Sequence, residues 1–217
     1  MDFEQARFNM VEQQIRTWNV LDQHILNLLL EMRREDFVPA AYRNLAFIDM
    51  EIPLGHGEVM LTPKLEGRII QELAIKKTDK VLEVGTGSGY LTALLAREAH
   101  HVYSVEIVPE FKALATEKLQ AHGIHNVTLE EGDAAHGWDR HGPYDVIVLT
   151  GSVPVLPDSF TANLNPGGRL FAVVGDAPAM EGKLLTCLGK GVCRVADLFE
   201  TSVPPLRNAL QPQRFTF

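Results

Sequence analysis

The chain has 217 residues, of which 46% are hydrophobic and 22% charged, values typical of an ordinary folded domain. They exclude a disordered tail, a collagen-like chain and a small disulfide scaffold. Its 28 acidic residues outnumber its 20 basic residues, and the net charge of −8 argues against a sequence-independent nucleic-acid binder or a polybasic membrane anchor.

The start of the chain and its cysteines predict a cytoplasmic location. The first twenty residues are charged and lack the apolar core of a signal peptide, and no apolar run approaches the roughly 20 residues that span a bilayer. The two cysteines, Cys187 and Cys193, cannot form a disulfide framework. We expect them to be small buried hydrophobic residues rather than redox partners.

Helical periodicity dominates the first forty residues. A helix is predicted over residues 2–17, capped by Asp2, with an apolar face at Phe8, Val11, Ile15 and Trp18. A second helix begins near residue 20, ends before Pro39 and presents Leu21, Ile25, Leu28, Leu29 and Met32. The charged run 32–36 is expected to be its solvated end. Residues 40–61 have no clear period, which predicts loops with one or two short strands.

From Thr62 onwards, strands alternate with helices. Thr62 and Pro63 are typical of a helix start, with the threonine hydroxyl as the cap. The last two strands are expected to form a hairpin about Gly189-Lys190-Gly191. Helices are predicted from Thr62 and over 90–98, 109–122 and 157–164, and strands over 80–84, 101–106, 126–129, 145–149, 168–174, 183–188 and 192–199.

This alternation predicts the α/β class, with a doubly wound, mostly parallel seven-stranded sheet, an N-terminal helical cap and a C-terminal antiparallel hairpin. We expect residues 1–60 to form the cap and 61–217 the core, together as one compact unit. Ligands of such sheets bind at the carboxyl ends of the strands. The site is therefore expected around residues 85, 106, 133 and 150.

The strongest motif is the glycine-rich run at 83–90, E-V-G-T-G-S-G-Y, between a predicted strand and a predicted helix. Glycines allow positive φ and a close approach of a ligand to the backbone. Glu106 ends the next strand, where a carboxylate can accept hydrogen bonds from both ribose hydroxyls. The motif favours a nucleoside site, and the alternative is a turn that only packs the strand against the helix.

Two ligand classes compete for this loop. A dinucleotide site has the spacing G-x-G-x-x-G, but here Tyr90 stands at the third glycine position. Glu83, two residues before the first glycine, repels a pyrophosphate and attracts an ammonium group. A phosphate-free nucleoside with a ribose and an amine fits better, and S-adenosyl-L-methionine is the predicted cofactor.

Two further strand ends carry candidate contacts. Asp133 follows Gly132 and can accept a hydrogen bond from the exocyclic amine of adenine while Ala134 packs on the ring, or it only caps a turn. Thr150 ends the fourth strand, either near a methyl acceptor or in a simple strand-ending turn. The eight histidines lack metal-binding spacing, so no metal site is expected.

These motifs resemble those of known enzymes. The run at 83–90, S-V-E at 104–106, G-D at 132–133 and Y-D-V-I-V at 144–148 resemble class I S-adenosylmethionine-dependent methyltransferases. Four further segments resemble the protein-L-isoaspartate O-methyltransferase family: M-V-E-Q-Q-I at 10–15, F-V-P at 37–39, A-F-I-D-M-E-I-P-L-G-H-G at 46–57 and P-G-G-R-L at 166–170. V-P-P-L at 203–206 is similar to the C-terminal substrate loop of that family.

The resemblance covers essentially the whole chain and implies a cytosolic repair enzyme that methylates the α-carboxylate of L-isoaspartyl residues in damaged proteins. It implies a Rossmann-like methyltransferase core over 61–217. Substrate contacts are expected at Val59, Met60, Pro205 and His56, although His56 serves loop packing equally well. The expected cofactor contacts are Glu83, Gly85, Thr86, Gly87, Ser88, Glu106, Ile107, Asp133, Ala134 and Thr150.

One departure from the family concerns its active-site serine. The family usually has T-I-S-x-P, whereas this chain has V-M-L-T-P at 59–63. Leu61 therefore stands at the serine position, and Thr62, one residue later, either replaces the serine or only caps the helix.

Three functions stay open. A carboxylate acceptor, with a pKa of about 4, is already ionised at neutral pH, so transfer needs alignment and exclusion of water rather than a base. Loss of the serine then need not abolish isoaspartyl methylation. The apolar Leu61 also suits a small-molecule acceptor, and a non-catalytic nucleoside-binding module is the third possibility. No nucleic-acid or membrane partner is expected, and the oligomeric state is not predicted.

Overall fold

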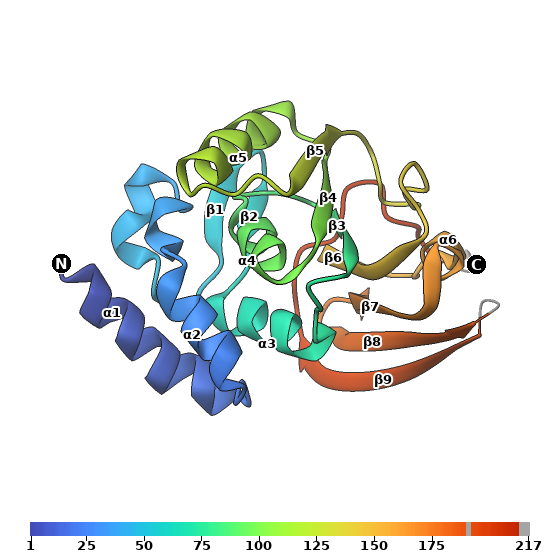
Figure 1. Cartoon of the computed structure of the whole chain (residues 1–217), viewed down its shortest axis with the longest axis horizontal. Coiled ribbons are helices and arrows are strands. Elements are labelled where there is room, and N and C mark those ends of the chain that lie inside the picture. The colour runs from blue at the N-terminus through green and yellow to red at the C-terminus, as the bar shows by residue number, and fades with distance from the viewer. Residues whose placement is uncertain (190–191, 213–217) are drawn as a thin grey trace, which may run out of the picture.

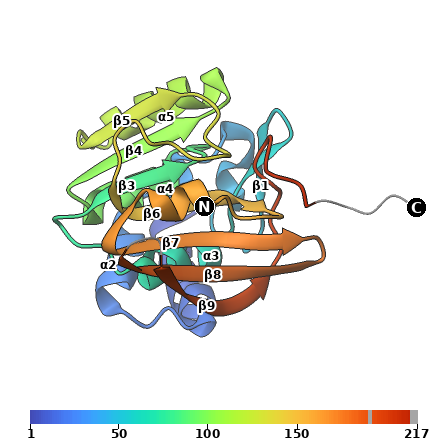
Figure 2. The same ribbon diagram turned by 90° about the vertical axis from the view of Figure 1, so that its right-hand side faces the viewer.

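The computed structural model describes residues 1–189 and 192–212. Its centre is a seven-stranded sheet in the order β5-β4-β3-β6-β7-β8-β9, as Figure 2 shows from top to bottom. The first five strands of that order are parallel, and β8 and β9 are antiparallel. The strands are β3 (Lys80–Val84), β4 (His101–Glu106), β5 (Val127–Glu131), β6 (Tyr144–Val153), β7 (Leu164–Asp176), β8 (Ala179–Gly189) and β9 (Val192–Thr201).

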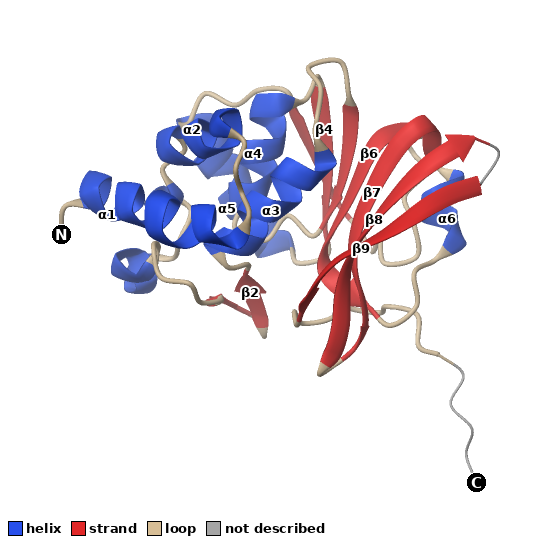
Figure 3. Cartoon of the chain, turned by 90° about the horizontal axis from the view of Figure 1, so that it is seen from below, coloured by secondary structure: helices blue, strands red, loops and turns tan. Residues whose placement is uncertain are grey.

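The helices lie on both faces of this sheet, so the predicted α/β fold is confirmed. In Figure 3, α1 to α5 gather on one side of the strands and α6 lies on the other. None of the helices in the described part of the chain is long and apolar enough to cross a membrane. The helices that follow the N-terminal segment are α3 (Pro63–Leu73), α4 (Tyr90–Glu98), α5 (Pro109–Ala121) and α6 (Asp158–Ala162).

The central strand β6 shows how the sheet is buried on both faces. Side chains alternate along a strand, so Val146 and Val148 join the core under the helices, whereas Ile147 and Leu149 join the core on the α6 side. All four are at most 1% exposed. Such a continuous apolar run is typical of a parallel strand covered by helices on both faces.

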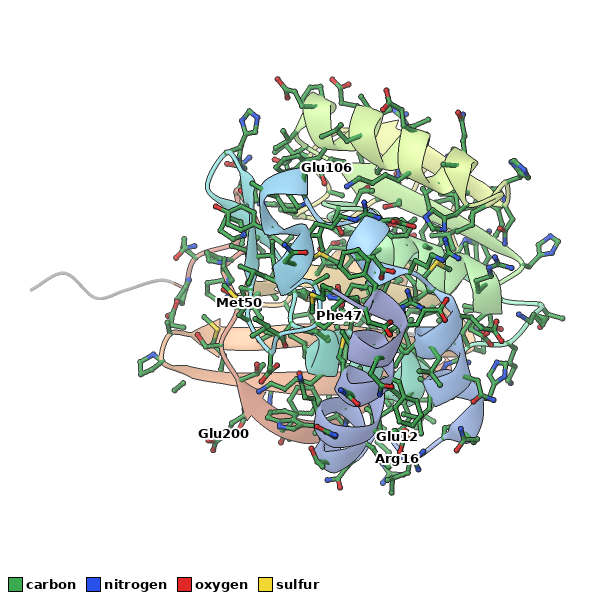
Figure 4. All side chains as sticks on the ribbon, turned by 90° about the vertical axis from the view of Figure 1, so that its left-hand side faces the viewer. Glu12, Arg16, Phe47, Met50, Glu106 and Glu200 are labelled. Carbon is green, nitrogen blue, oxygen red and sulfur yellow. A yellow bond between two sulfur atoms is a disulfide. The ribbon has the colours of Figure 1, made fainter. Side chains whose placement is uncertain are left out.

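The N-terminal helices cover one edge of the molecule, drawn in blue in Figure 1. Asp2 caps the first of them, because its Oδ1 accepts hydrogen bonds from the N–H groups of Glu4 and Gln5 at 3.1 Å. In the turns that follow this helix, the half-buried Glu12 and Arg16 form an ion pair (Figure 4). The segment comprises α1 (Phe3–Met10), a π-helical turn (Val11–Ile15), a 3₁₀ turn (Arg16–Trp18) and α2 (Gln23–Glu31).

The predicted apolar faces of these helices are only partly correct. Val11 and Ile15 are fully buried, but Phe8 is 50% and Trp18 37% exposed, and α1 buries Arg7 and Met10 in place of Phe8. Leu21 is also exposed, because α2 begins two residues after it.

The charged run 32–36 is not the solvated helix end that its composition predicts. Arg34 is fully buried and Glu35 nearly so. Arg34 donates hydrogen bonds to the carbonyl oxygens of Ala46 (2.8 Å) and Leu61 (2.7 Å) and to the Glu66 carboxylate. Glu35 pairs with Arg7. Buried charges need such partners; the Arg34–Glu66 pair joins the cap to α3, whereas Arg7–Glu35 lies within the cap.

A short hairpin links the cap to α3, as the sequence predicts for residues 40–61. After 3₁₀ turns at Arg34–Asp36 and Ala40–Leu45, β1 (Ile52–Gly55) pairs antiparallel with β2 (Glu58–Met60). The turn between them places His56 and Gly57 at positive φ, 53° and 83°.

The hairpin of β8 and β9 corrects the prediction for the cysteines. Cys187 and Cys193 lie opposite each other in the register and form a disulfide. Their pairing depends on the cross-strand register, which the sequence spacing alone does not reveal. Residues 190 and 191 of the predicted turn lie outside the described part of the chain.

Candidate active site

A cavity opens at the carboxyl ends of β3, β4 and β6, where the topology predicts a ligand site. It has three adjoining parts. The central chamber lies between Gly85, Glu106 and Thr150 on one side and the β1–β2 hairpin with residues 204–207 on the other. The outer chamber reaches Gly132–Ala135, and the inner chamber reaches Val59–Leu61, Glu66 and Gly85–Ser88.

The glycine loop needs its glycines for the backbone conformation and for space. Gly85 has φ +97°, and a Cβ there would lie 2.2 Å from Thr150 Oγ1. The Thr150 hydroxyl is shared between the carbonyl oxygens of Val84 (2.9 Å) and Gly85 (2.8 Å), which fixes the loop to β6. Thr150 does not end this strand as predicted, because β6 continues to Val153. The N–H of Gly87, also at positive φ, donates to Glu106 Oε2 at 2.8 Å.

Glu106 presents a fixed carboxylate to the central and outer chambers. Besides the Gly87 contact, its Oε1 accepts the N–H of Val108 at 2.9 Å. Each carboxylate oxygen keeps a further lone-pair site, so this group can accept two hydroxyl hydrogen bonds from a ribose. Ile107, also predicted, lines the same two chambers, and Figure 4 labels Glu106.

Asp133 lies in the outer chamber and has the turn-capping role that the sequence offered as one alternative. Its Oδ1 accepts the N–H of Ala135 at 3.0 Å and so caps the turn, while Oδ2 accepts the Asn208 side-chain amide at 2.8 Å. The buried Ala134 lines the chamber beside it. The Asp133 Oδ2 atom, which accepts the Asn208 amide, is the one that an exocyclic amine would use.

Glu83 does not lie in the cavity, contrary to the direct ammonium contact expected for it. It is fully buried, and its Oε2 accepts hydrogen bonds from Thr92 (2.5 Å) and Ser104 (2.6 Å). Burial raises the pKa of Glu83 to about 8, although both hydroxyls favour the carboxylate. Ser104 also contacts the Thr86 hydroxyl at 2.6 Å, so Glu83 supports the glycine loop from below.

The inner chamber contains the position of the family serine. Leu61 lines it and is 7% exposed, and Thr86, Ser88 and Met60 line it as well. Thr62 does not line it. Thr62 begins α3 as predicted, but its side chain makes no capping hydrogen bond, so the prediction for its hydroxyl is wrong.

The remaining predicted substrate residues lie around the opening. Val59 and Pro205 line the central chamber. His56 lies on the rim, where its ring is edge-on to that of Phe111, with the two ring centroids 5.5 Å apart. Arg207 ties the two sides of the opening together, because its Nε donates to Glu58 Oε1 (2.7 Å) and its Nη2 to the His56 carbonyl oxygen (2.6 Å).

Sequence reasoning missed several residues of this cavity. Glu58, Glu66, Phe111 and Arg207 belong to no motif, whereas Leu54 and Leu206 were not predicted although they lie in the family-like segments 46–57 and 203–206. Ser152 brings the C-terminal segment to the cavity, a role that only the fold reveals. Its N–H donates to the carbonyl oxygen of Pro204, and its carbonyl oxygen accepts the N–H of Leu206, both at 2.9 Å.

The charges of the cavity fit the predicted cofactor. Among the described lining residues, the carboxylates of Glu58, Glu66, Glu106 and Asp133 face a single guanidinium, that of Arg207, which is itself paired with Glu58. Such a surface disfavours a pyrophosphate and favours a cation. The residues present therefore suit S-adenosyl-L-methionine, a nucleoside with a sulfonium and an ammonium group.

Comparisons with known sequences agree with this geometry. The family model described as protein-L-isoaspartate(D-aspartate) O-methyltransferase matches residues 5–190. The chain is also 37% identical over 199 residues to protein-L-isoaspartate O-methyltransferase 1 of Anaeromyxobacter sp. (strain Fw109-5), a match that covers 90% of this chain and 93% of that protein.

Two solved structures share the fold. One named protein-L-isoaspartate O-methyltransferase has a TM-score of 0.78 at 25% identity; the match covers 92% of this chain but only 65% of the length of that one. Another, from Plasmodium falciparum and assigned to the same activity, was solved in complex with S-adenosyl-L-homocysteine. It has a TM-score of 0.76 at 19% identity over 93% of this chain and 98% of its own.

Proposed function

Since the chain belongs to the protein-L-isoaspartate(D-aspartate) O-methyltransferase family, we propose that it methylates the α-carboxylate of isoaspartyl residues in damaged polypeptides. It is an S-adenosyl-L-methionine-dependent methyltransferase, as the family is. The observation that carries the choice of acceptor is that two family-specific segments, 46–57 and 203–206, contribute residues to the same cavity as the glycine loop.

The cofactor is proposed to lie along the strand ends. Glu106 would receive the ribose hydroxyls, Asp133 the exocyclic amine of adenine, and Ala134 would pack on the ring. Gly85 and Gly87 allow the ligand to approach the backbone closely. When bound, the cofactor supplies a methyl group on a positively charged sulfur.

The acceptor side needs no proton transfer. A carboxylate is ionised at neutral pH, so the protein has to align it and remove its water. Leu54, Val59, Leu61 and Pro205 offer an apolar surface for this purpose in the central chamber. Leu61 supplies no hydroxyl to orient the carboxylate. The Thr62 hydroxyl makes no hydrogen bond that caps α3.

The test is methyl ester formation. Purified protein, labelled cofactor and an isoaspartyl peptide are expected to give a base-labile methyl ester, while the matching aspartyl peptide gives none. Tight binding of S-adenosyl-L-homocysteine without any ester on the isoaspartyl peptide would reject this acceptor but keep the cofactor.

A small apolar acceptor, such as a hydrophobic carboxylate or a phenol, is the second candidate, and the buried Leu61 at the serine position favours it. The variant Leu61→Ser separates the two. If the wild type has no peptide activity and the variant gains it, the small acceptor is supported. If the wild type esterifies the peptide and the variant does so at a similar rate, the second candidate is rejected.

A further inference from the structure

The three chambers follow one another in a fixed order along the strand ends. The outer chamber shares Gly85 and Glu106 with the central one, and the central chamber shares Gly85, Gly87 and Thr150 with the inner one. A nucleoside with its adenine at Asp133 and its ribose at Glu106 therefore directs its 5′ substituent toward the inner chamber. In S-adenosyl-L-methionine that substituent carries the amino-acid group.

Glu66 is the carboxylate that lines the inner chamber. It belongs to the first turn of α3, is 2% exposed and lies across from Gly85–Ser88. Its Oε2 receives the Arg34 guanidinium. The described hydrogen bond to the Glu66 carboxylate reaches Oε2, and Glu66 lines the chamber. Glu66 thus has one oxygen held by Arg34, which leaves Oε1 for a further donor.

The charge around Glu66 is not balanced by Arg34 alone. Arg34 already donates to Glu66 and to the carbonyl oxygens of Ala46 and Leu61, so it fixes the carboxylate and the Leu61 backbone together. Ionisation of Glu83, behind the glycine loop, would raise the pKa of Glu66 further. Burial raises the pKa of Glu66 to about 8, against the attraction of Arg34, so a cationic ligand beside it would favour its ionised form.

We infer that Glu66, and not Glu83, binds the α-ammonium group of the cofactor through its Oε1. This inference rests on the proposed function for the identity of the cofactor and goes beyond it by naming the group that recognises the amino-acid end. It makes Glu66 a cofactor-binding residue and Arg34 the positioning residue that holds its carboxylate beside Leu61.

The experiment measures binding by calorimetry for three ligands: S-adenosyl-L-homocysteine, its analogue without the amino group, and 5′-methylthioadenosine, which lacks the whole amino-acid group. Glu66→Gln keeps an oxygen for Arg34 but removes the charge. We expect it to weaken S-adenosyl-L-homocysteine about tenfold or more, because hydrogen bonds to charged groups are the strong ones. The other two ligands should change less than about twofold.

Glu83→Gln is the matched control, a buried carboxylate changed in the same way beneath the same loop. It should alter the affinity for all three ligands by the same factor. An amine-selective loss in Glu83→Gln, or an equal loss for all ligands in Glu66→Gln, overturns the inference. If Glu66→Gln does not fold, Arg34→Met combined with Glu66→Leu removes the whole pair, and the same amine-selective loss is expected.

The proposed function and this inference fail in different ways. If the wild type does not bind S-adenosyl-L-homocysteine, both are rejected. If it binds that ligand no better than the analogue without the amino group, only the role of Glu66 is rejected, whatever the acceptor proves to be.

Discussion

The two walls of the cavity are built differently. The wall at the strand ends consists of loops that directly follow β3, β4 and β5 together with Thr150 and Gly151 of β6. Backbone groups hold its key side chains, as Gly87 and Val108 hold Glu106. The opposite wall combines the β1–β2 hairpin with residues 204–207, about 150 positions later in the chain, and side chains join them.

We expect the strand-end wall to tolerate few substitutions and the opposite wall to tolerate more. Backbone amides and glycines with positive φ tolerate few substitutions, so a cofactor site built from them keeps its shape. The opposite wall is closed by the Arg207–Glu58 pair, whose side chains are 39% and 30% exposed. Single substitutions in such a wall can alter which acceptor the protein binds. Leu61, predicted to stand at the position of the family serine, lies on this wall.

The largest effect should come from Gly85→Ala in the strand-end wall. The added methyl would meet Thr150 Oγ1 at 2.2 Å at a φ of +97°, so the loop must move and both Thr150 hydrogen bonds are lost. We expect the free energy of unfolding to fall by about 2–4 kcal/mol and S-adenosyl-L-homocysteine binding to weaken more than about 100-fold. Chemical denaturation and calorimetry measure both.

Gly57→Ala in the opposite wall is the control for that prediction. Gly57 also has positive φ, +83°, but a Cβ there has no neighbour within 4 Å. It should cost about 1 kcal/mol of stability through backbone strain alone and leave cofactor affinity within about threefold. Equal losses of affinity in the two variants would show that the walls do not differ in this way.

The next largest effect concerns the pH dependence of the strand-end wall. The pKa of Glu83 is 4.5 in the unfolded chain and about 8 in the folded protein, so its favourable contribution is complete below pH 4.5 and is lost as the pH rises through 8. Glu83→Gln resembles the protonated form. Its stability advantage over the wild type should therefore grow by roughly 2–4 kcal/mol between pH 5 and 8.

Denaturation of both proteins at several pH values measures this difference. Titration of groups that do not interact with Glu83 cancels in the comparison, whereas Glu66 is coupled to Glu83 and contributes to the difference. Glu117→Gln, which changes an exposed carboxylate on α5, should show a constant difference from the wild type across the same range. A Glu83→Gln difference that is flat with pH would mean that Glu83 is ionised in the folded protein.

A smaller effect is expected from opening the other wall. Arg207→Met keeps an apolar stem but removes the bonds to Glu58 and to the His56 carbonyl oxygen. We expect KM for the isoaspartyl peptide to rise about fivefold, with cofactor affinity within about twofold, because the backbone-held contacts stay. Arg140→Met, which removes an exposed pair with Glu130, should change neither constant.

The same division explains which features the sequence predicted. The bounds of α4 and β4 match the prediction residue by residue, and Gly85, Glu106, Asp133 and Thr150 meet at one cavity, because local periodicity and topology determine them. Burial of Arg34 and Glu66 depends on a contact between residues 32 positions apart, and charged residues are normally exposed. No local pattern signals such a pair, or the π-helical turn at Val11–Ile15.

The smallest effect is expected at Thr62, and it decides whether this residue replaces the family serine. The hydroxyl makes no capping bond, so Thr62→Ala should cost less than about 0.5 kcal/mol of stability, compared with about 1 kcal/mol for a working cap. Since Thr62 does not line the cavity as Leu61 does, peptide methylation should stay within about twofold. A large loss of kcat with unchanged stability and cofactor affinity would mean that the hydroxyl turns toward the acceptor during catalysis. The acceptor wall would then have moved its orienting group by one residue, and Leu61 would serve only to exclude water.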